Sequence, residues 1–157
     1  MQHLELARQQ QRIDHIFELM GNSLQGAEIQ AHGARYLCVL VSGYLEITIR
    51  TIYRTYGEAC ANPNVARYVA RQLNGFQNPR MEPIVQLAGS FNAEWGEQLK
   101  AATDGEIKDA VDSLIDLRNS IAHGRDVDVT YARVRDYYER ARRLVNLIQQ
   151  QCQGSGT

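Results

Sequence analysis

The stretch Tyr36-Leu-Cys-Val-Leu-Val-Ser-Gly-Tyr-Leu45 decides the fold of this chain. It is apolar nearly all round a helix, which is expected of a helix buried on several sides. The same periodicity continues on both sides of it and predicts one long helix over about residues 27–59. The central glycine, Gly43, either lets a neighbouring backbone come close or only weakens the helix slightly. We expect the other helices to pack around this one.

Apolar spacing outside this stretch is also helical almost throughout. Further helices are expected at residues 3–20, from Asn62-Pro63 to about Asn74, at 82–89, at 92–101, from Thr103 to His123, and from Thr130 onward. Thr103-Asp-Gly-Glu106 has the pattern of a capping box, in which Thr103 would cap the helix and Glu106 would return the bond. Because no strand-type alternation persists, the sequence predicts an all-α bundle of about five to seven helices.

The length of 157 residues is enough for one domain with a full core. We expect a single domain over residues 1–152 and a disordered tail over residues 153–157. No apolar run is long enough to span a bilayer, so no membrane association is expected. The three cysteines have no metal-type spacing and suit a reducing compartment, which predicts a cytoplasmic protein without a metal or cofactor.

The net charge of −1 at pH 7 means that the whole molecule does not attract nucleic acid strongly. Six arginines nevertheless fall between Arg125 and Arg143. They either guide a polyanion or form a solvated helix face that pairs with the local acids. Those acids are Asp126, Asp128, Asp136 and Glu139.

The segment Arg118-Asn-Ser-Ile-Ala-His123 carries the candidate chemistry, at a helix end marked by Gly124. A guanidinium binds phosphate through two parallel bonds, and an imidazole moves protons near neutral pH. Asn119 and His123 are four residues apart and share a helix face, so the amide is placed to orient the imidazole. Arg118 is turned away by about 140° but is long enough to reach around the helix end. The negative end of the helix dipole favours the cationic imidazole.

These groups match the needs of RNA strand cleavage without a metal. The 2′-OH attacks the adjacent phosphorus, a base accepts its proton, a cation stabilises the charged intermediate, and an acid protonates the leaving 5′ oxygen. One histidine does not easily fill both proton roles, whereas a two-fold dimer supplies two. The structural alternative is that Arg118 and His123 only cap carbonyls and pair with Asp116 or Asp126.

Glu46 and Arg50 form a second candidate pair, four residues apart on the most apolar helix. A charge there is costly without a partner. The structural interpretation is a mutual ion pair, with Arg54 as a further member. The functional interpretation is a supporting carboxylate that orients Arg118 or His123 across the bundle.

Leu117-Arg-Asn-Ser-Ile-Ala-His-Gly124 resembles the signature of the HEPN superfamily, in which an arginine is followed after four to six residues by a histidine, usually with a polar residue after the arginine. Val41–Arg50 resembles the second helix of one branch, often named RiboL-PSP-HEPN. The segment from Phe91 through Trp95 to Leu99 and the tyrosine-rich last helix are also similar to that branch. The resemblance extends over roughly residues 30–150.

The resemblance implies an all-α fold that dimerises through the motif face and takes RNA as substrate. It implies a metal-independent endoribonuclease that leaves 2′,3′-cyclic phosphate and 5′-OH ends. By position, Arg118 and His123 would be the catalytic pair and Asn119 their support. Many superfamily members act in toxin–antitoxin or phage-defence systems, so an antitoxin or a nucleotidyltransferase is a candidate partner. Others have lost catalysis and serve as RNA- or nucleotide-binding or scaffold domains. This chain keeps the full motif, which favours an active enzyme.

Overall fold

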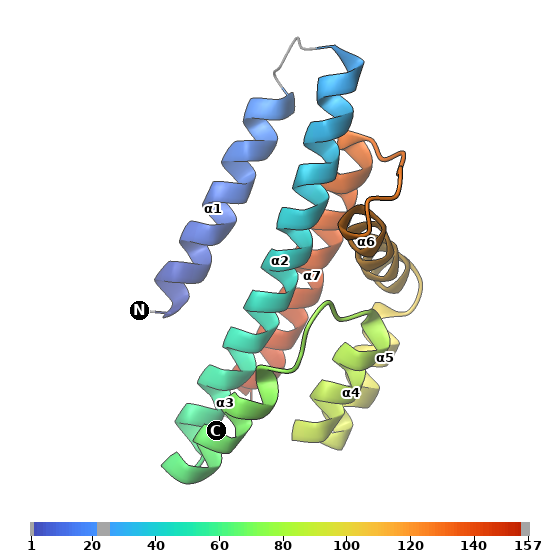
Figure 1. The fold of residues 1–157 in the computed structure, drawn as a ribbon. Coiled ribbons are helices and arrows are strands. Elements are labelled where there is room, and N and C mark those ends of the chain that lie inside the picture. Colours follow the sequence, from blue (N-terminus) through green and yellow to red (C-terminus); the bar gives the residue numbers. More distant parts are fainter. Residues whose placement is uncertain (1, 22–25, 155–157) are drawn as a thin grey trace.

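The computed structural model describes residues 2–21 and 26–154, and within them the chain forms seven α-helices and no strand (Figure 1). The helices are α1 (Gln2–Gly21), α2 (Ala27–Cys60), α3 (Pro63–Leu73), α4 (Met81–Phe91), α5 (Ala93–Thr103), α6 (Glu106–Ala122) and α7 (Tyr131–Gly154). The prediction of an all-α bundle of five to seven helices is therefore confirmed. None of the helices in the described residues is long and apolar enough to cross a membrane.

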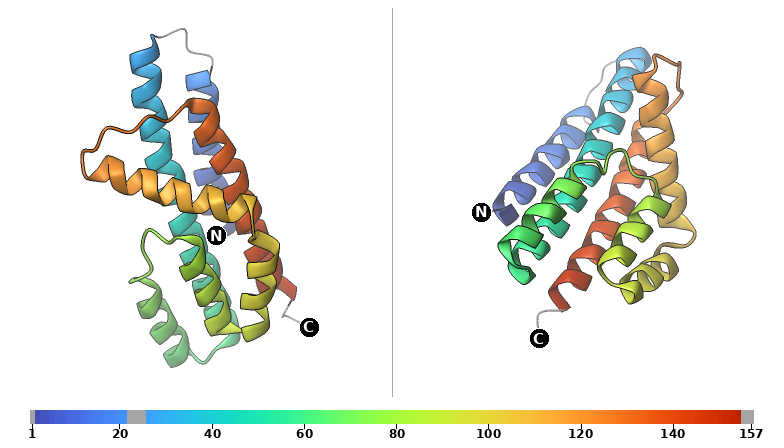
Figure 2. Two further views of the ribbon diagram at one scale, coloured as in Figure 1. Left: turned by 90° about the vertical axis from the view of Figure 1, so that its right-hand side faces the viewer. Right: turned by 60° about the horizontal axis from the view of Figure 1, so that its bottom comes forward.

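The long helices α2 and α7 pack along each other and form the spine of the bundle (Figure 1). Helix α1 lies against α2, α6 crosses both spine helices, and α4 and α5 form a helical hairpin beside α7 (Figure 2). The centre of α2 is the core of this arrangement, because Leu37, Val41 and Leu45 are fully buried. Burial of such apolar side chains is the main stabilising contribution to the fold.

One stripe of α2 departs from the predicted all-round burial. Tyr36 is 53% exposed, Val39 is 40% exposed and Ile47 is 44% exposed. Gly43 lies on the same helix face, and a Cβ added there would meet no atom within 4 Å. We call these four residues the α2 stripe. No part of the described chain covers it.

The α4–α5 hairpin owes its close crossing to two glycines. A Cβ added to Gly96 would lie 2.9 Å from the Cα of Gly89, so the two backbones touch where they cross. Asn92 caps α5 by accepting a hydrogen bond from the backbone N–H of Glu94 at 2.9 Å. Phe91 at the end of α4 and Trp95 in α5 both contact the ring of Tyr56 in α2.

Two local expectations were wrong. Thr103 does not cap α6: it is the last residue of α5, and its hydroxyl donates to the carbonyl of Leu99 at 2.8 Å. The N-cap of α6 is Gly105, whose φ of 93° lies in a region that favours glycine. The tail expected to be disordered from residue 153 is helical at its start, since α7 continues through Gln153 to Gly154. The rest of that tail, residues 155–157, lies outside the described residues.

Candidate active site

The motif lies at the C-terminal end of α6, and the backbone of that end is closed by its own hydrogen bonds. His123 is the C-cap, with its N–H bonded to the carbonyl of Asn119 at 3.1 Å. Gly124 follows with φ of 70°, its N–H bonds to Ile121, and the N–H of Arg125 bonds to Ser120. This pair of bonds is a Schellman motif, which requires the left-handed conformation that glycine adopts without strain. The helix end predicted at His123-Gly124 is confirmed.

The three motif side chains differ in their exposure. Arg118 and Asn119 are half-buried, whereas His123 is exposed at the tip of the helix. Arg118 Nη1 donates to Asn119 Oδ1 at 3.4 Å, so the amide contacts the guanidinium. The expectation that Asn119 orients the imidazole has no counterpart in the hydrogen bonds of the described residues. The imidazole therefore faces solvent with room for a substrate group.

The acids beside the motif contact other partners. Asp116 pairs with Arg80, which comes from the loop between α3 and α4. Asp126 lies 3.7 Å from Arg35 of α2, and the same guanidinium donates to the carbonyl of Val127 at 3.2 Å. Among the residues that the structure describes, Arg118 has no carboxylate within ion-pair distance. Its positive charge is thus available to an anion.

The loop between α3 and α4 fixes the motif helix relative to α2. On one side, Glu46 accepts hydrogen bonds from the backbone N–H of Asn78 at 2.7 Å and from Arg50 at 3.3 Å. On the other side, Asp112 of α6 accepts from the backbone N–H of Met81 at 2.9 Å. Glu46 thus pairs with Arg50 as the structural interpretation expected, and it also holds this loop. No hydrogen bond of the described residues joins Glu46 to Arg118 or His123.

Asp112 shows the electrostatics of this junction. Burial alone would raise the pKa of its carboxyl group, but hydrogen bonds from Lys108 and from the Met81 N–H outweigh burial and lower the pKa below its ordinary value. Met81 begins α4, so the carboxylate also satisfies an unpaired N–H at a helix start. The roles of Asp112 and Arg80 were not recognised in the sequence, because the bonds from Met81 to Asp112 and from Arg80 to Asp116 join residues more than 30 positions apart.

Cys38 and Cys152 do not supply a reactive thiolate here. Burial raises the pKa of the Cys38 thiol to about 11, and its Sγ lies 3.8 Å from the carbonyl of Leu114. Burial and the neighbouring Cys60 raise the pKa of Cys152 to about 11 as well. Within the described ranges, no group of three or more His, Cys, Asp or Glu side chains is placed to hold a metal ion.

The all-α bundle of seven helices in the described residues is consistent with a domain of the HEPN superfamily. The family model RiboL-PSP-HEPN matches residues 5–154, nearly the whole chain, and the protein belongs to this family. No curated protein and no solved structure matches the chain. Membership of this family indicates a nuclease or another RNA-related function.

Proposed function

We propose that this protein is a metal-independent endoribonuclease whose catalytic groups are Arg118 and His123. The observation that carries the proposal is the half-buried Arg118, which has no acidic partner among the described residues and lies about one and a half helical turns from an exposed imidazole. In this role the guanidinium binds the scissile phosphate and stabilises the negative charge that develops on it. Asn119 supports the pair by holding the guanidinium rather than the imidazole.

The proposed reaction is an internal transfer. The ribose 2′ oxygen forms a bond to phosphorus, and the bond from phosphorus to the 5′ oxygen breaks. The proton of the 2′-OH passes to a base, and an acid returns a proton to the leaving oxygen. The products are a 2′,3′-cyclic phosphate and a 5′-OH end. His123 fills one of the two proton roles in its own subunit.

The second role is proposed for His123 of a second copy, in a two-fold dimer that forms through the motif face. The uncovered α2 stripe supports this proposal. It begins beside Arg35, which holds the linker that follows the motif. An apolar surface left open next to a half-complete site is well suited to a second copy of the same surface.

The test is RNA cleavage in the presence of EDTA, with wild type and His123→Ala compared on the same substrates. We expect the wild type to produce cyclic-phosphate and 5′-OH ends, and the variant to lose at least about 100-fold in rate. His15→Ala, which removes another exposed histidine, is the matched control and should retain activity. Cleavage that EDTA abolishes and magnesium restores would contradict the mechanism.

A second candidate function is a catalytically silent module that binds RNA or nucleotides or acts as a protein scaffold. The specific observation in its favour is that no hydrogen bond within the described residues orients the His123 ring. This function predicts that His123→Ala weakens a complex while neither protein cleaves RNA. Cleavage by the wild type that is absent from the variant would exclude it.

For the biological role, we propose a toxin or phage-defence effector controlled by an antitoxin or a nucleotidyltransferase partner. Support comes from the family, many of whose members act in this way. Expression of the wild type should then arrest the growth of a bacterial host, because cellular RNA is cut. Equal growth of cells that express wild type and His123→Ala at equal levels would argue against the proposal.

A further inference from the structure

The outer face of α3 combines cations with one exposed aromatic ring. Asn64, Arg67, Tyr68 and Arg71 recur at helical spacing and are all exposed, opposite the buried Leu73. We call these four residues the α3 surface. Tyr68 is 62% exposed, which is unusual for a large aromatic side chain.

The arginines of the α3 surface are not neutralised. Residues 63–73 contain no aspartate or glutamate. No carboxylate of the described chain lies within ion-pair distance of Arg67 or Arg71. The α3 surface therefore presents positive charge without local competition, despite the net charge of −1 of the whole chain.

The arginine-rich segment that the sequence singled out, between Arg125 and Arg143, is different. Arg140 pairs with Asp136 and lies 3.5 Å from Glu106. Arg142 lies 3.8 Å from Glu139 and stacks over the ring of Tyr138. Two of the six arginines are thus paired within the fold, and the segment also contains four acids, whereas α3 contains none, so the α3 surface is the better candidate for binding a polyanion.

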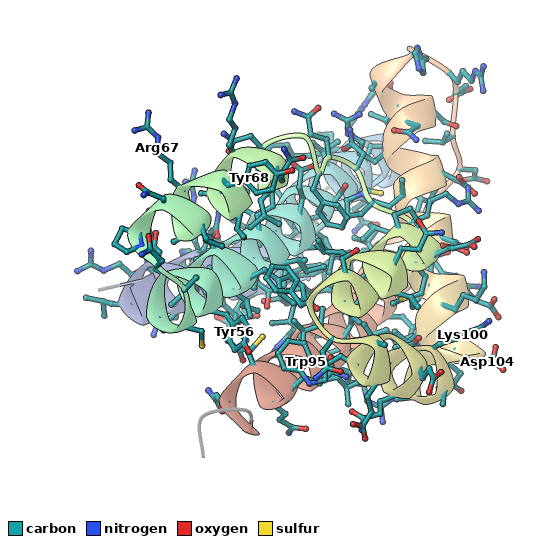
Figure 3. The ribbon with its side chains drawn as sticks, turned by 90° about the horizontal axis from the view of Figure 1, so that it is seen from below. Tyr56, Arg67, Tyr68, Trp95, Lys100 and Asp104 are labelled. Carbon is teal, nitrogen blue, oxygen red and sulfur yellow. The ribbon has the colours of Figure 1, made fainter. Side chains whose placement is uncertain are left out.

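The α3 surface also lies on the same side of the molecule as the candidate active site at the end of α6 (Figure 2, left). Helix α3 and the C-terminal end of α6 project on the same side, with the loop of residues 74–80 between them (Figure 2, left). Figure 3 shows Arg67 and Tyr68 on the outside of α3, on the side where the end of α6 projects. A chain that passes the α6 end can therefore continue along this loop to α3.

We propose that the α3 surface binds an unpaired stretch of RNA that flanks the bond cut at the α6 end, an inference that rests on the proposed function. Arg67 and Arg71 contact phosphates, and Tyr68 stacks on a base. A basic groove interleaved with aromatic side chains is the usual means of binding single strands without strong sequence preference. The α3 surface would favour long unstructured substrates over short ones.

The test measures binding rather than cleavage, in a His123→Ala background that leaves the RNA intact. Fluorescence anisotropy compares unstructured RNA of about 20 nucleotides with RNA of about 4 nucleotides. We expect Arg67→Gln/Arg71→Gln to weaken binding of the long RNA by about tenfold. The same double variant should lower the salt slope by about 1.4, since two phosphates each contribute about 0.7. Tyr68→Ala should cost at least about fivefold.

The matched control is Arg133→Gln/Arg143→Gln, which removes the same charge from two exposed arginines of α7. It should change affinity by less than about twofold. An equal loss in both double variants would mean that only net charge matters, and no loss in either would show that α3 does not bind RNA; each result overturns the inference. Unchanged RNA binding with self-association lost in Tyr68→Ala would overturn it in favour of a protein contact.

The two proposals can fail separately. If the wild type cleaves no RNA but the α3 double variant binds it less tightly, the α3 surface stands as an RNA site and the nuclease function fails. If cleavage depends on His123 but the α3 variants bind long RNA like their background, the nuclease stands and the α3 surface fails.

Discussion

Glu46 is a charged residue on the most apolar helix, and its hydrogen bonds to Arg50 and to the α3–α4 loop explain why it lies there. Its side chain is 18% exposed, and its two oxygens accept bonds from Arg50 and from the backbone of Asn78. Asn78 has a φ of 46°, an uncommon value for a residue other than glycine, so the loop needs this anchor at that point. The carboxylate satisfies the loop backbone, and Arg50 balances its charge.

Glu46→Gln should therefore lower the free energy of unfolding by about 1–2 kcal/mol, because hydrogen bonds to a charged group are replaced by weaker ones. The rate of RNA cleavage per folded molecule should not change. Urea unfolding and single-turnover cleavage measure the two quantities, and Glu58→Gln on an exposed position of the same helix is the control. A large fall in cleavage rate at unchanged stability would instead assign Glu46 to orienting Arg118 or His123.

At the scale of whole helices, Gly96 and Gly89 face each other at the crossing of α4 and α5, but only Gly96 lacks space for a larger side chain. Gly96 lies at the crossing of α4 and α5, where an added Cβ would be 2.9 Å from Gly89 Cα and 3.3 Å from the carbonyl oxygen of Val85. Gly96→Ala should thus destabilise the protein by about 1–3 kcal/mol. Gly89→Ala is the control at the same crossing, because its Cβ would find only an ordinary 3.8 Å contact. Thermal unfolding of the two variants should separate them.

Gly43 has open space around it within one subunit, so a larger side chain there costs the monomer nothing and improves helix propensity by up to about 1 kcal/mol. In the proposed dimer the same position faces a second copy. Gly43→Leu should keep or raise thermal stability of the subunit while the dimer dissociates, as followed by sedimentation velocity at several concentrations. Cleavage should fall together with dimer content. If the wild type is a dimer and Gly43→Leu has the same sedimentation coefficient, Gly43 does not lie in the dimer interface.

At the scale of the whole molecule, the loop between α3 and α4 joins helix α2 to helix α6. It is bonded to α2 through Glu46 and to α6 through Asp112 and Asp116. The distance between the motif helix and the spine thus depends on acidic side chains. Acid should weaken this junction before it affects the apolar core.

The lowered pKa of Asp112 gives the direction of that effect. A carboxyl group whose pKa is lower in the folded state stabilises the fold above its unfolded pKa and loses this contribution as pH falls through the folded pKa. The free energy of unfolding should decline as pH falls below about 4, and Asp112→Asn should flatten that decline. The difference in stability between wild type and variant, from urea unfolding, should be largest near pH 7 and shrink toward about pH 2. A difference independent of pH would contradict the assignment.

Local features of this fold were predictable from sequence, and long-range ones were not. The order of the helices and the end at Gly124 follow from apolar spacing and glycine chemistry within a few residues. The pairs Arg80–Asp116 and Glu46–Asn78 join residues 36 and 32 positions apart, and no local pattern marks them. Thr103 matched a capping box, yet its hydroxyl bonded back to Leu99 and the chain turned at Gly105 instead. Tyr36 and Val39 were expected in the core but are exposed. The apolar sequence of α2 does not show which side of the helix has no neighbouring helix.

The Schellman turn after His123 has a consequence for how this scaffold tolerates change. Because the bonds that close α6 lie entirely between Asn119 and Arg125, the backbone position of His123 is set by a short peptide. Insertions between the exposed Arg125 and Asp126, ahead of the Val127 carbonyl that Arg35 binds and of the buried Val129, would lengthen a surface segment at small entropic cost. That segment is therefore the place where a sensor peptide or a whole domain can be inserted while the spacing of the motif is kept.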